Sequence, residues 1–181
     1  GTGLTYPIKR RTPTWPRSFM PQDQTVRDLV ARMKLIPIEE LITGQRMVFC
    51  EDSIVRGTQL QDTVQRLYAS GAREVHMRPA CPPLVFGCKY LNFSRSKSVM
   101  DLAGRRAVKE LEGTADCVPE DYYNADSDKY AAMVERIRLR LNLTTLKYQK
   151  LDDLVEAIGM PKSKLCTYCW DGCTGCKCPC E

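Results

Sequence analysis

The sequence predicts an α/β fold with a parallel sheet, followed by a helical, cysteine-rich extension. A short apolar run at 46–50 precedes a helical pattern, and a second strand-like run follows at 73–80. Strand, helix and strand at this spacing form a βαβ unit, whose two strands are parallel. The extension is indicated by the cysteines, because six of the ten lie within the last sixteen residues.

The N-terminal region carries few regular signals. Prolines recur through residues 1–23, so we expect this stretch to be irregular. A helix is expected next, with Asp23 as its N-cap. Its apolar positions follow the i, i+3, i+4, i+7 pattern and are Val26, Leu29, Val30 and Met33.

The βαβ unit has clear boundaries. The first strand, Arg46 to Cys50, is bounded upstream by Gly44. The helix that follows has Leu60, Val64, Leu67 and Tyr68 on one face and should stop at Gly71. The second strand is expected from Arg73 to Ala80.

Beyond this unit the pattern is mixed. Residues 84–93 fit either a strand or a loop, 98–111 fit a helix, and 112–128 fit a surface loop. Two further helices are expected, and the cysteine-rich tail begins at Cys166. Their apolar positions are Tyr130, Met133, Val134, Ile137 and Leu141 in the first, and Leu151, Leu154, Val155 and Ile158 in the second, which stops at Gly159.

Composition sets the broad class. The chain has 181 residues, 43% of them hydrophobic and 27% charged, as in a globular protein with one α/β core. No apolar run approaches the roughly 20 residues that cross a bilayer, and basic residues interrupt any signal-peptide core. We therefore expect a cytoplasmic protein that does not bind membranes. The net charge of +5 suits a phosphate-bearing ligand but is also compatible with no such role.

The stretch at 47–58 has the features of a phosphate site. An apolar strand ends in Glu51 and Asp52, where ligands bind in open α/β folds. Carboxylates accept hydrogen bonds from ribose hydroxyls and hold hydrated Mg²⁺. The turn then ends in Gly57 and Thr58 and opens a helix, whose N–H groups attract an anion. The alternative is a strand followed by an ordinary acidic turn.

The stretch Met47 to Thr58 resembles the phosphoribosylpyrophosphate (PRPP) signature of type I phosphoribosyltransferases. More of the chain resembles the glutamine PRPP amidotransferase family. The matching segments are Arg17-Ser18-Phe19, Gln24, Arg27, Arg32-Met33-Lys34-Leu35, Cys81-Pro82-Pro83, Cys88, Leu151 to Gly159, and Cys166-Thr167-Tyr168-Cys169.

This resemblance implies a type I phosphoribosyltransferase fold and the transfer of ammonia to C1 of PRPP, the first step of purine synthesis. It implies that Glu51 and Asp52 hold the ribose hydroxyls and Mg²⁺. It also implies three regions: an active-site loop remnant at 1–23, the transferase core at 24–128, and C-terminal helices with a cysteine-rich tail at 129–181. The implied substrate-binding residues are Ser53, Ile54, Val55, Arg56, Gly57, Thr58, Arg17 and Lys34.

The sequence also departs from the family. Glu51 stands where the family usually has Asp, and Glu-Asp occurs in transferases that act on nucleobases, which remain the alternative. No counterpart is present for the glutaminase domain, the first strand or the pyrophosphate loop. We therefore expect these residues to correspond to the C-terminal part of the family enzyme, to use ammonia from a glutaminase domain that is absent here, and not to hydrolyse glutamine themselves. A further alternative is an inactive PRPP-binding or interaction module.

The cysteines are compatible with more than one kind of site. Cys166 and Cys169 form a CxxC, which suits zinc, a cluster or a redox pair. The resemblance adds Cys88 and implies a [4Fe–4S] cluster with three of its four family ligands in this chain. The cysteines after Gly172 are able to supply the fourth thiolate or to bind Zn²⁺ alone.

Other charged and polar groups have simpler readings. The single histidine, His76, lies on a predicted strand and is interpreted as structural. The basic run Lys9-Arg10-Arg11 lacks the aromatic residues typical of nucleic-acid binding, and the resemblance implies a place near a pyrophosphate instead. The family resemblance further implies a homo-oligomer that purine nucleotides inhibit.

Overall fold

The computed structural model describes residues 8–10, 35–88, 99–114 and 118–172. Several expectations lie outside these residues. They are the helix after Asp23, the proposed contacts of Arg17 and Lys34, and the cysteine tail after Gly172.

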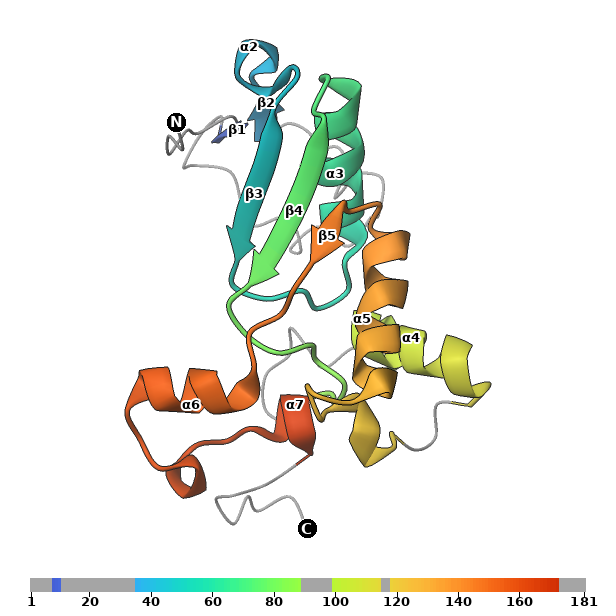
Figure 1. The fold of residues 1–181 in the computed structure, drawn as a ribbon, viewed down its shortest axis with the longest axis vertical. Coiled ribbons are helices and arrows are strands. Elements are labelled where there is room, and N and C mark those ends of the chain that lie inside the picture. Colours follow the sequence, from blue (N-terminus) through green and yellow to red (C-terminus); the bar gives the residue numbers. More distant parts are fainter. Residues whose placement is uncertain (1–7, 11–34, 89–98, 115–117, 173–181) are drawn as a thin grey trace, which may run out of the picture.

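A parallel sheet of three strands organises the fold (Figure 1), in the order β3-β4-β5. Its strands are β3 (Arg46–Glu51), β4 (Glu74–Pro79) and β5 (Thr145–Leu146). The register pairs β3 with β4 over their whole length, from Arg46 opposite Glu74 to Glu51 opposite Pro79. The predicted βαβ unit and its parallel sheet are confirmed. The short strand β5 was not expected.

Two helices pack against one face of this sheet. Helix α3 (Thr58–Ala69) connects β3 to β4, and α5 (Asp128–Arg140) precedes β5. The Ser127 hydroxyl caps α5 by accepting the Tyr130 N–H at 3.0 Å. The sheet and both helices share one buried cluster, which includes Met47, Val64, Leu67, Val75, Met77, Met133 and Ile137. The apolar faces expected from the sequence therefore form the core.

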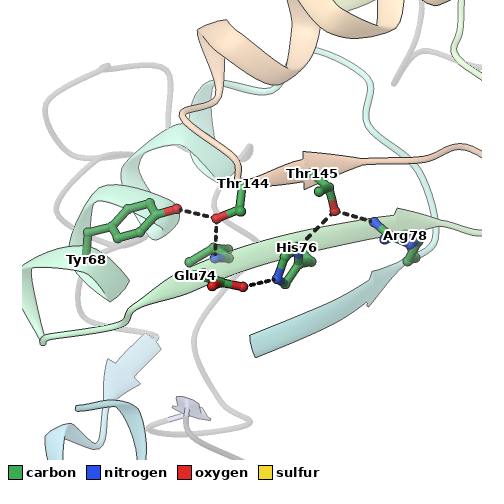
Figure 2. Close-up of polar contacts among 7 residues, drawn as sticks. Tyr68, Glu74, His76, Arg78, Thr144 and Thr145 are labelled. Atoms are coloured by element: carbon green, nitrogen blue, oxygen red, sulfur yellow. Dashed lines mark hydrogen bonds and ion pairs between the residues drawn. The ribbon is translucent and has the colours of Figure 1, made fainter. Parts of the chain in front are cut away.

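On the opposite face of the sheet, the residues of β4 are polar. Because side chains alternate along a strand, the residues of β4 on this face are Glu74, His76 and Arg78. Figure 2 shows that His76 lies between Glu74 and Thr145, with Nε2 at 3.0 Å from the carboxylate and Nδ1 at 2.9 Å from the hydroxyl. Arg78 donates to the same Thr145 hydroxyl at 3.1 Å. Both ring nitrogens of His76 are thus used: Nδ1 links β4 to β5, and Nε2 binds Glu74 within β4.

The segment after β4 differs in part from expectation. Residues 84–88 form a loop, which decides between strand and loop for the described part of 84–93. The expected helix at 98–111 is instead a short 3-10 turn, η1 (Val99–Asp101), followed by α4 (Ala103–Glu112). The two are separate because Leu102 is extended, with ψ at 131°, and buries its side chain in the core. Within the expected loop, η2 (Glu120–Tyr122) buries Tyr122.

Near the N-terminus, an antiparallel pair joins β1 (Ile8–Arg10) to β2 (Leu35–Pro37). The expectation of irregular structure throughout 1–23 is therefore wrong at Ile8–Arg10. A four-residue helix, α2 (Glu39–Ile42), leads from β2 towards β3.

The C-terminal part lies below the carboxyl edge of the sheet in Figure 1. Helix α6 (Leu151–Ile158) ends at Gly159, as expected, with this glycine in the left-handed conformation. It is followed by η3 (Lys162–Lys164) and α7 (Tyr168–Asp171). No helix in the described ranges is long and apolar enough to span a membrane.

Candidate functional site

The candidate site is the connection between β3 and α3, which leaves the sheet at its carboxyl edge (Figure 1). Ligands of open α/β sheets bind at this edge, because the loops that follow the strands gather there. The expected residues from Glu51 to Thr58 are all described, and they form one continuous segment. Arg17 and Lys34 lie outside the described residues.

The acid pair stands at the start of this segment, and both acidic side chains are exposed. Glu51 keeps its backbone in the sheet, since its carbonyl accepts the Ala80 N–H at 2.8 Å. The Asp52 carboxylate accepts the Ser53 N–H at 2.6 Å, which fixes the turn.

The two carboxyl groups act on each other. Although Glu51 is exposed as a residue, the protein partly surrounds its carboxyl group, and this partial burial is the first cause that raises its pKa; the hydrogen bond and negative charge of Asp52 raise it further. An acid held under such repulsion gains from a cation or a hydroxyl donor placed nearby. The pair is therefore suited to Mg²⁺ or to sugar hydroxyls.

The turn after the acids is held by a side chain that it buries in the core. Ile54 is only 3% exposed and belongs to the core. Gly57 has φ at 79° and precedes the first residue of α3. A Cβ at this position would approach Leu141 Cδ2 to 3.0 Å, in a backbone conformation that side chains disfavour. The chain therefore requires glycine where the loop turns into the helix.

The turn presents backbone donors. Within the part of the chain that the structure describes, the N–H groups of Arg56, Gly57 and Thr58 have no hydrogen-bond acceptor. They lie at the N-terminus of a twelve-residue helix, where the helix dipole favours negative charge. Free N–H groups at such a position form a site for a phosphate group.

Sequence reasoning missed the element that supports this turn. The first N–H of α4, from Ala103, donates to the Val55 carbonyl at 2.8 Å. The Arg106 guanidinium donates through Nη2 to the Arg56 carbonyl at 2.5 Å. No local signal marks Arg106, because it lies fifty residues beyond its partner in the chain.

Of the predicted metal ligands, the structure brings the segment of Cys169 beside the loop that leads to Cys88. The Cys169 carbonyl accepts the N–H groups of Val85 and Phe86 at 3.0 and 3.1 Å, so the CxxC segment packs beside the loop that leads to Cys88. However, no group of three or more potential metal ligands is present among the described residues. As arranged there, Cys88, Cys166 and Cys169 do not form a complete ligand set.

Cys81 adjoins the same region without having been assigned a role. Burial raises the pKa of its thiol, while a hydrogen bond from the Trp170 side chain lowers it. The indole N–H nevertheless has no partner of ordinary hydrogen-bond geometry, so we regard this contact as weak. The nearby charge of Asp52 also raises the pKa of Cys81, which places this thiol close to the acid pair.

Sequence comparison finds clear relatives, although no family model matches the chain. An amidophosphoribosyltransferase of Mycobacterium tuberculosis is 33% identical over 156 residues, which cover 86% of this chain and 25% of that protein. The amidophosphoribosyltransferase of Methanothermobacter thermautotrophicus is 30% identical over the same length, covering 86% of this chain and 27% of the relative.

Structure comparison agrees. The Bacillus subtilis glutamine PRPP amidotransferase, solved with ADP and GMP, superposes with a TM-score of 0.60 at 24% identity. The match covers 93% of this chain and 32% of that enzyme.

The parallel three-stranded sheet with its helices matches the type I phosphoribosyltransferase fold. This fold defines the class of protein. Within the class, the chain is a homologue of the amidophosphoribosyltransferases of bacteria, archaea and plants. It spans about a quarter of the length of the curated relatives that it matches.

Proposed function

We propose that this chain provides the phosphoribosyl-transfer part of an amidophosphoribosyltransferase. In this reaction the nitrogen of ammonia forms a bond to C1 of PRPP, the bond from C1 to the pyrophosphate oxygen breaks, and the nitrogen gives up a proton. The products are 5-phosphoribosylamine and pyrophosphate, in the first step of purine synthesis. In the intact enzyme, a glutaminase domain would supply this ammonia from glutamine.

One observation carries the proposal: in the turn that leads from the acid pair into α3, three N–H groups have no partner among the described residues. The 5-phosphate would accept hydrogen bonds from Arg56, Gly57 and Thr58. Glu51 and Asp52 would accept hydrogen bonds from the neighbouring ribose hydroxyls. Holding the sugar at both ends fixes C1 relative to the incoming nitrogen, which is how positioning lowers a barrier. Arg17 and Lys34 remain proposed substrate contacts.

The acid pair also fits Mg²⁺, since one or two carboxylates together with substrate oxygens and water are its usual ligands. Glu51 and Asp52 would hold the ion, partly through water. When bound, Mg²⁺ would neutralise charge on the leaving pyrophosphate.

A metal centre at the cysteines is a separate proposal. Its support is the backbone contact between Cys169 and the loop that leads to Cys88. A [4Fe–4S] cluster, or Zn²⁺ as the alternative, would need a fourth ligand and a closer arrangement of the three thiols. Its role would be structural, and no catalytic step depends on it.

Purine nucleotides are proposed as inhibitors of the intact enzyme, because the similar Bacillus subtilis protein was solved with ADP and GMP. We also propose a homo-oligomer, in line with the family resemblance.

Titration calorimetry with PRPP and Mg²⁺ tests the proposal. Asp52→Ala should weaken binding by about 1.5–3 kcal/mol, or roughly tenfold or more, because it removes a charge-assisted hydrogen bond. Asp62→Ala is the matched control, since Asp62 is an exposed acid within α3. Equal binding by wild type and Asp52→Ala would instead favour an interaction module.

Product analysis separates the two transfer reactions. With ammonia as the acceptor, the protein should release pyrophosphate and form 5-phosphoribosylamine. Pyrophosphate release that depends on a nucleobase and does not respond to ammonia would identify a nucleobase transferase.

A further inference from the structure

Helix α4 holds two successive carbonyl groups of the β3–α3 turn. The Val55 carbonyl accepts the Ala103 N–H at 2.8 Å, and the Arg56 carbonyl accepts from Arg106 Nη2 at 2.5 Å. One contact comes from the backbone of α4 and the other from a side chain one turn later. The turn is thus fixed by an element that the βαβ unit does not contain.

These contacts determine where the donors of the turn point. In a trans peptide the C=O of one residue and the N–H of the next point in opposite directions, and the described residues contain no cis peptide. With the Val55 carbonyl directed to α4, the Arg56 N–H points away from it. By the same geometry, the Arg106 contact turns the Gly57 N–H away from α4.

The conformation of Gly57 completes the arrangement. Its φ of 79° and ψ of −7° are left-handed, and the next residue begins α3. A left-handed residue in such a turn brings successive N–H groups towards one concave surface, which suits an anion. The carbonyl groups face α4, so the open side of the turn carries donors.

Arg106 lies in surroundings that disfavour its positive charge, so its contact with the Arg56 carbonyl is not explained by a favourable site for the guanidinium. Burial lowers the pKa of its guanidinium, and the charge of Arg140 lowers it further. Among the described residues, its Nε is buried without a hydrogen-bond partner. There, the guanidinium makes only one hydrogen bond besides that to the Arg56 carbonyl, a long one of 3.4 Å from Nη2 to the Asp101 carbonyl. The negative charges of Asp101 and Glu110 act in the opposite direction and raise this pKa in part.

We infer that Arg106 is a positioning residue, which holds the Arg56 carbonyl so that the Gly57 N–H meets the phosphate of the ligand. The guanidinium also places a positive charge beneath the bound anion. This inference rests on the proposed function, because it concerns the same phosphate site. It adds a residue that does not touch the substrate and that lies on a different helix.

Calorimetry with ribose 5-phosphate on the 181-residue chain tests the inference. Arg106→Ala should weaken binding about five- to tenfold, since a charge-assisted hydrogen bond no longer orders the turn. Arg106→Lys keeps one donor and a positive charge, and should restore most of the affinity. Lys109→Ala removes an exposed charge from the same helix and should bind like wild type.

A spectroscopic readout separates positioning from general stability. In ¹H–¹⁵N spectra, the Gly57 amide of the ligand-free protein should move in Arg106→Ala, while amides of the sheet such as Val75 stay in place. Wild-type affinity in Arg106→Ala, or an equal loss in Lys109→Ala, would overturn the inference and leave the proposed function standing. A wild-type chain that does not bind ribose 5-phosphate would overturn the proposed function itself.

Discussion

At the residue scale, the acid pair carries an electrostatic cost in the ligand-free protein. The pKa of Glu51 is raised above its ordinary value of 4.5, so the folded state binds a proton more readily than the unfolded state. Stability then falls as the pH rises from about 4.5 through the raised pKa, and the loss is complete above it. Binding groups that repel each other in the free protein are typical of sites that await a ligand.

Replacing Glu51 should therefore stabilise the ligand-free fold. Glu51→Gln is expected to raise the free energy of unfolding at pH 7 by on the order of 0.5 kcal/mol, a small value because solvent screens an exposed pair. Urea unfolding between pH 4 and pH 8 measures this. The gain should disappear towards pH 4, where Glu51 of the wild type is protonated. A loss of stability at pH 7 would contradict the electrostatic account.

Single residues differ in how far the sequence reveals them. Glu51, Asp52 and Gly57 could be predicted, because an acid pair and a glycine at a strand-to-helix turn are local patterns. Arg106 could not be predicted, because its contact with the Arg56 carbonyl spans fifty residues. The predicted roles of the loop residues as ligand contacts await measurement.

At the element scale, α4 is placed by a close approach to the loop after β4. A Cβ on Gly104 would lie 2.7 Å from the Leu84 carbonyl oxygen and 3.0 Å from the Val85 side chain. Only glycine allows α4 to pack at this distance. The same placement brings Ala103 and Arg106 to the turn between β3 and α3.

Gly104→Ala tests this packing. Within a helix, glycine to alanine normally stabilises by about 0.5–1 kcal/mol. Here the clash with backbone should reverse the sign and destabilise by about 1–3 kcal/mol. Lys109→Ala, at an exposed position of α4, should change stability by less than about 0.5 kcal/mol. A stabilised Gly104→Ala variant in thermal unfolding would show that α4 is free to move away.

Long periodic elements could be predicted and short ones could not. The faces of α3, α5 and α6 follow from apolar spacing, and the glycines that follow α3 and α6 are predicted from turn chemistry. The two-residue strand β5 gives no periodic signal, because it is defined by its pairing with β4. The break at Leu102 was missed for a similar reason, since burial rather than spacing decides it.

At the scale of the whole molecule, the C-terminal segment returns to the loop that follows β4. Cys169 makes the backbone contact, and the side chain of Phe86 packs on Tyr168 with ring centroids 5.6 Å apart. Cys169 of the C-terminal segment and Cys88 of the loop after β4 therefore lie on adjoining segments. A bound metal or cluster would join them covalently.

Metal analysis after anaerobic purification tests the centre. With a cluster, the protein should contain iron and sulfide and absorb near 400 nm, roughly where such clusters absorb. Cys88→Ser and Cys166→Ser should each abolish this absorbance, whereas Cys180→Ser should retain it. A colourless protein with stoichiometric zinc and no sulfide would contradict the cluster.

If the turn between β3 and α3 binds the phosphate of a phosphorylated ribose, as proposed, its amide groups should respond to such a ligand. Titration of the ¹⁵N-labelled chain with ribose 5-phosphate, followed through its amide resonances, measures this response. We expect saturable shifts that are largest at the N–H groups of Arg56, Gly57 and Thr58. Unchanged resonances at these three amides, with or without shifts elsewhere, would contradict the proposal.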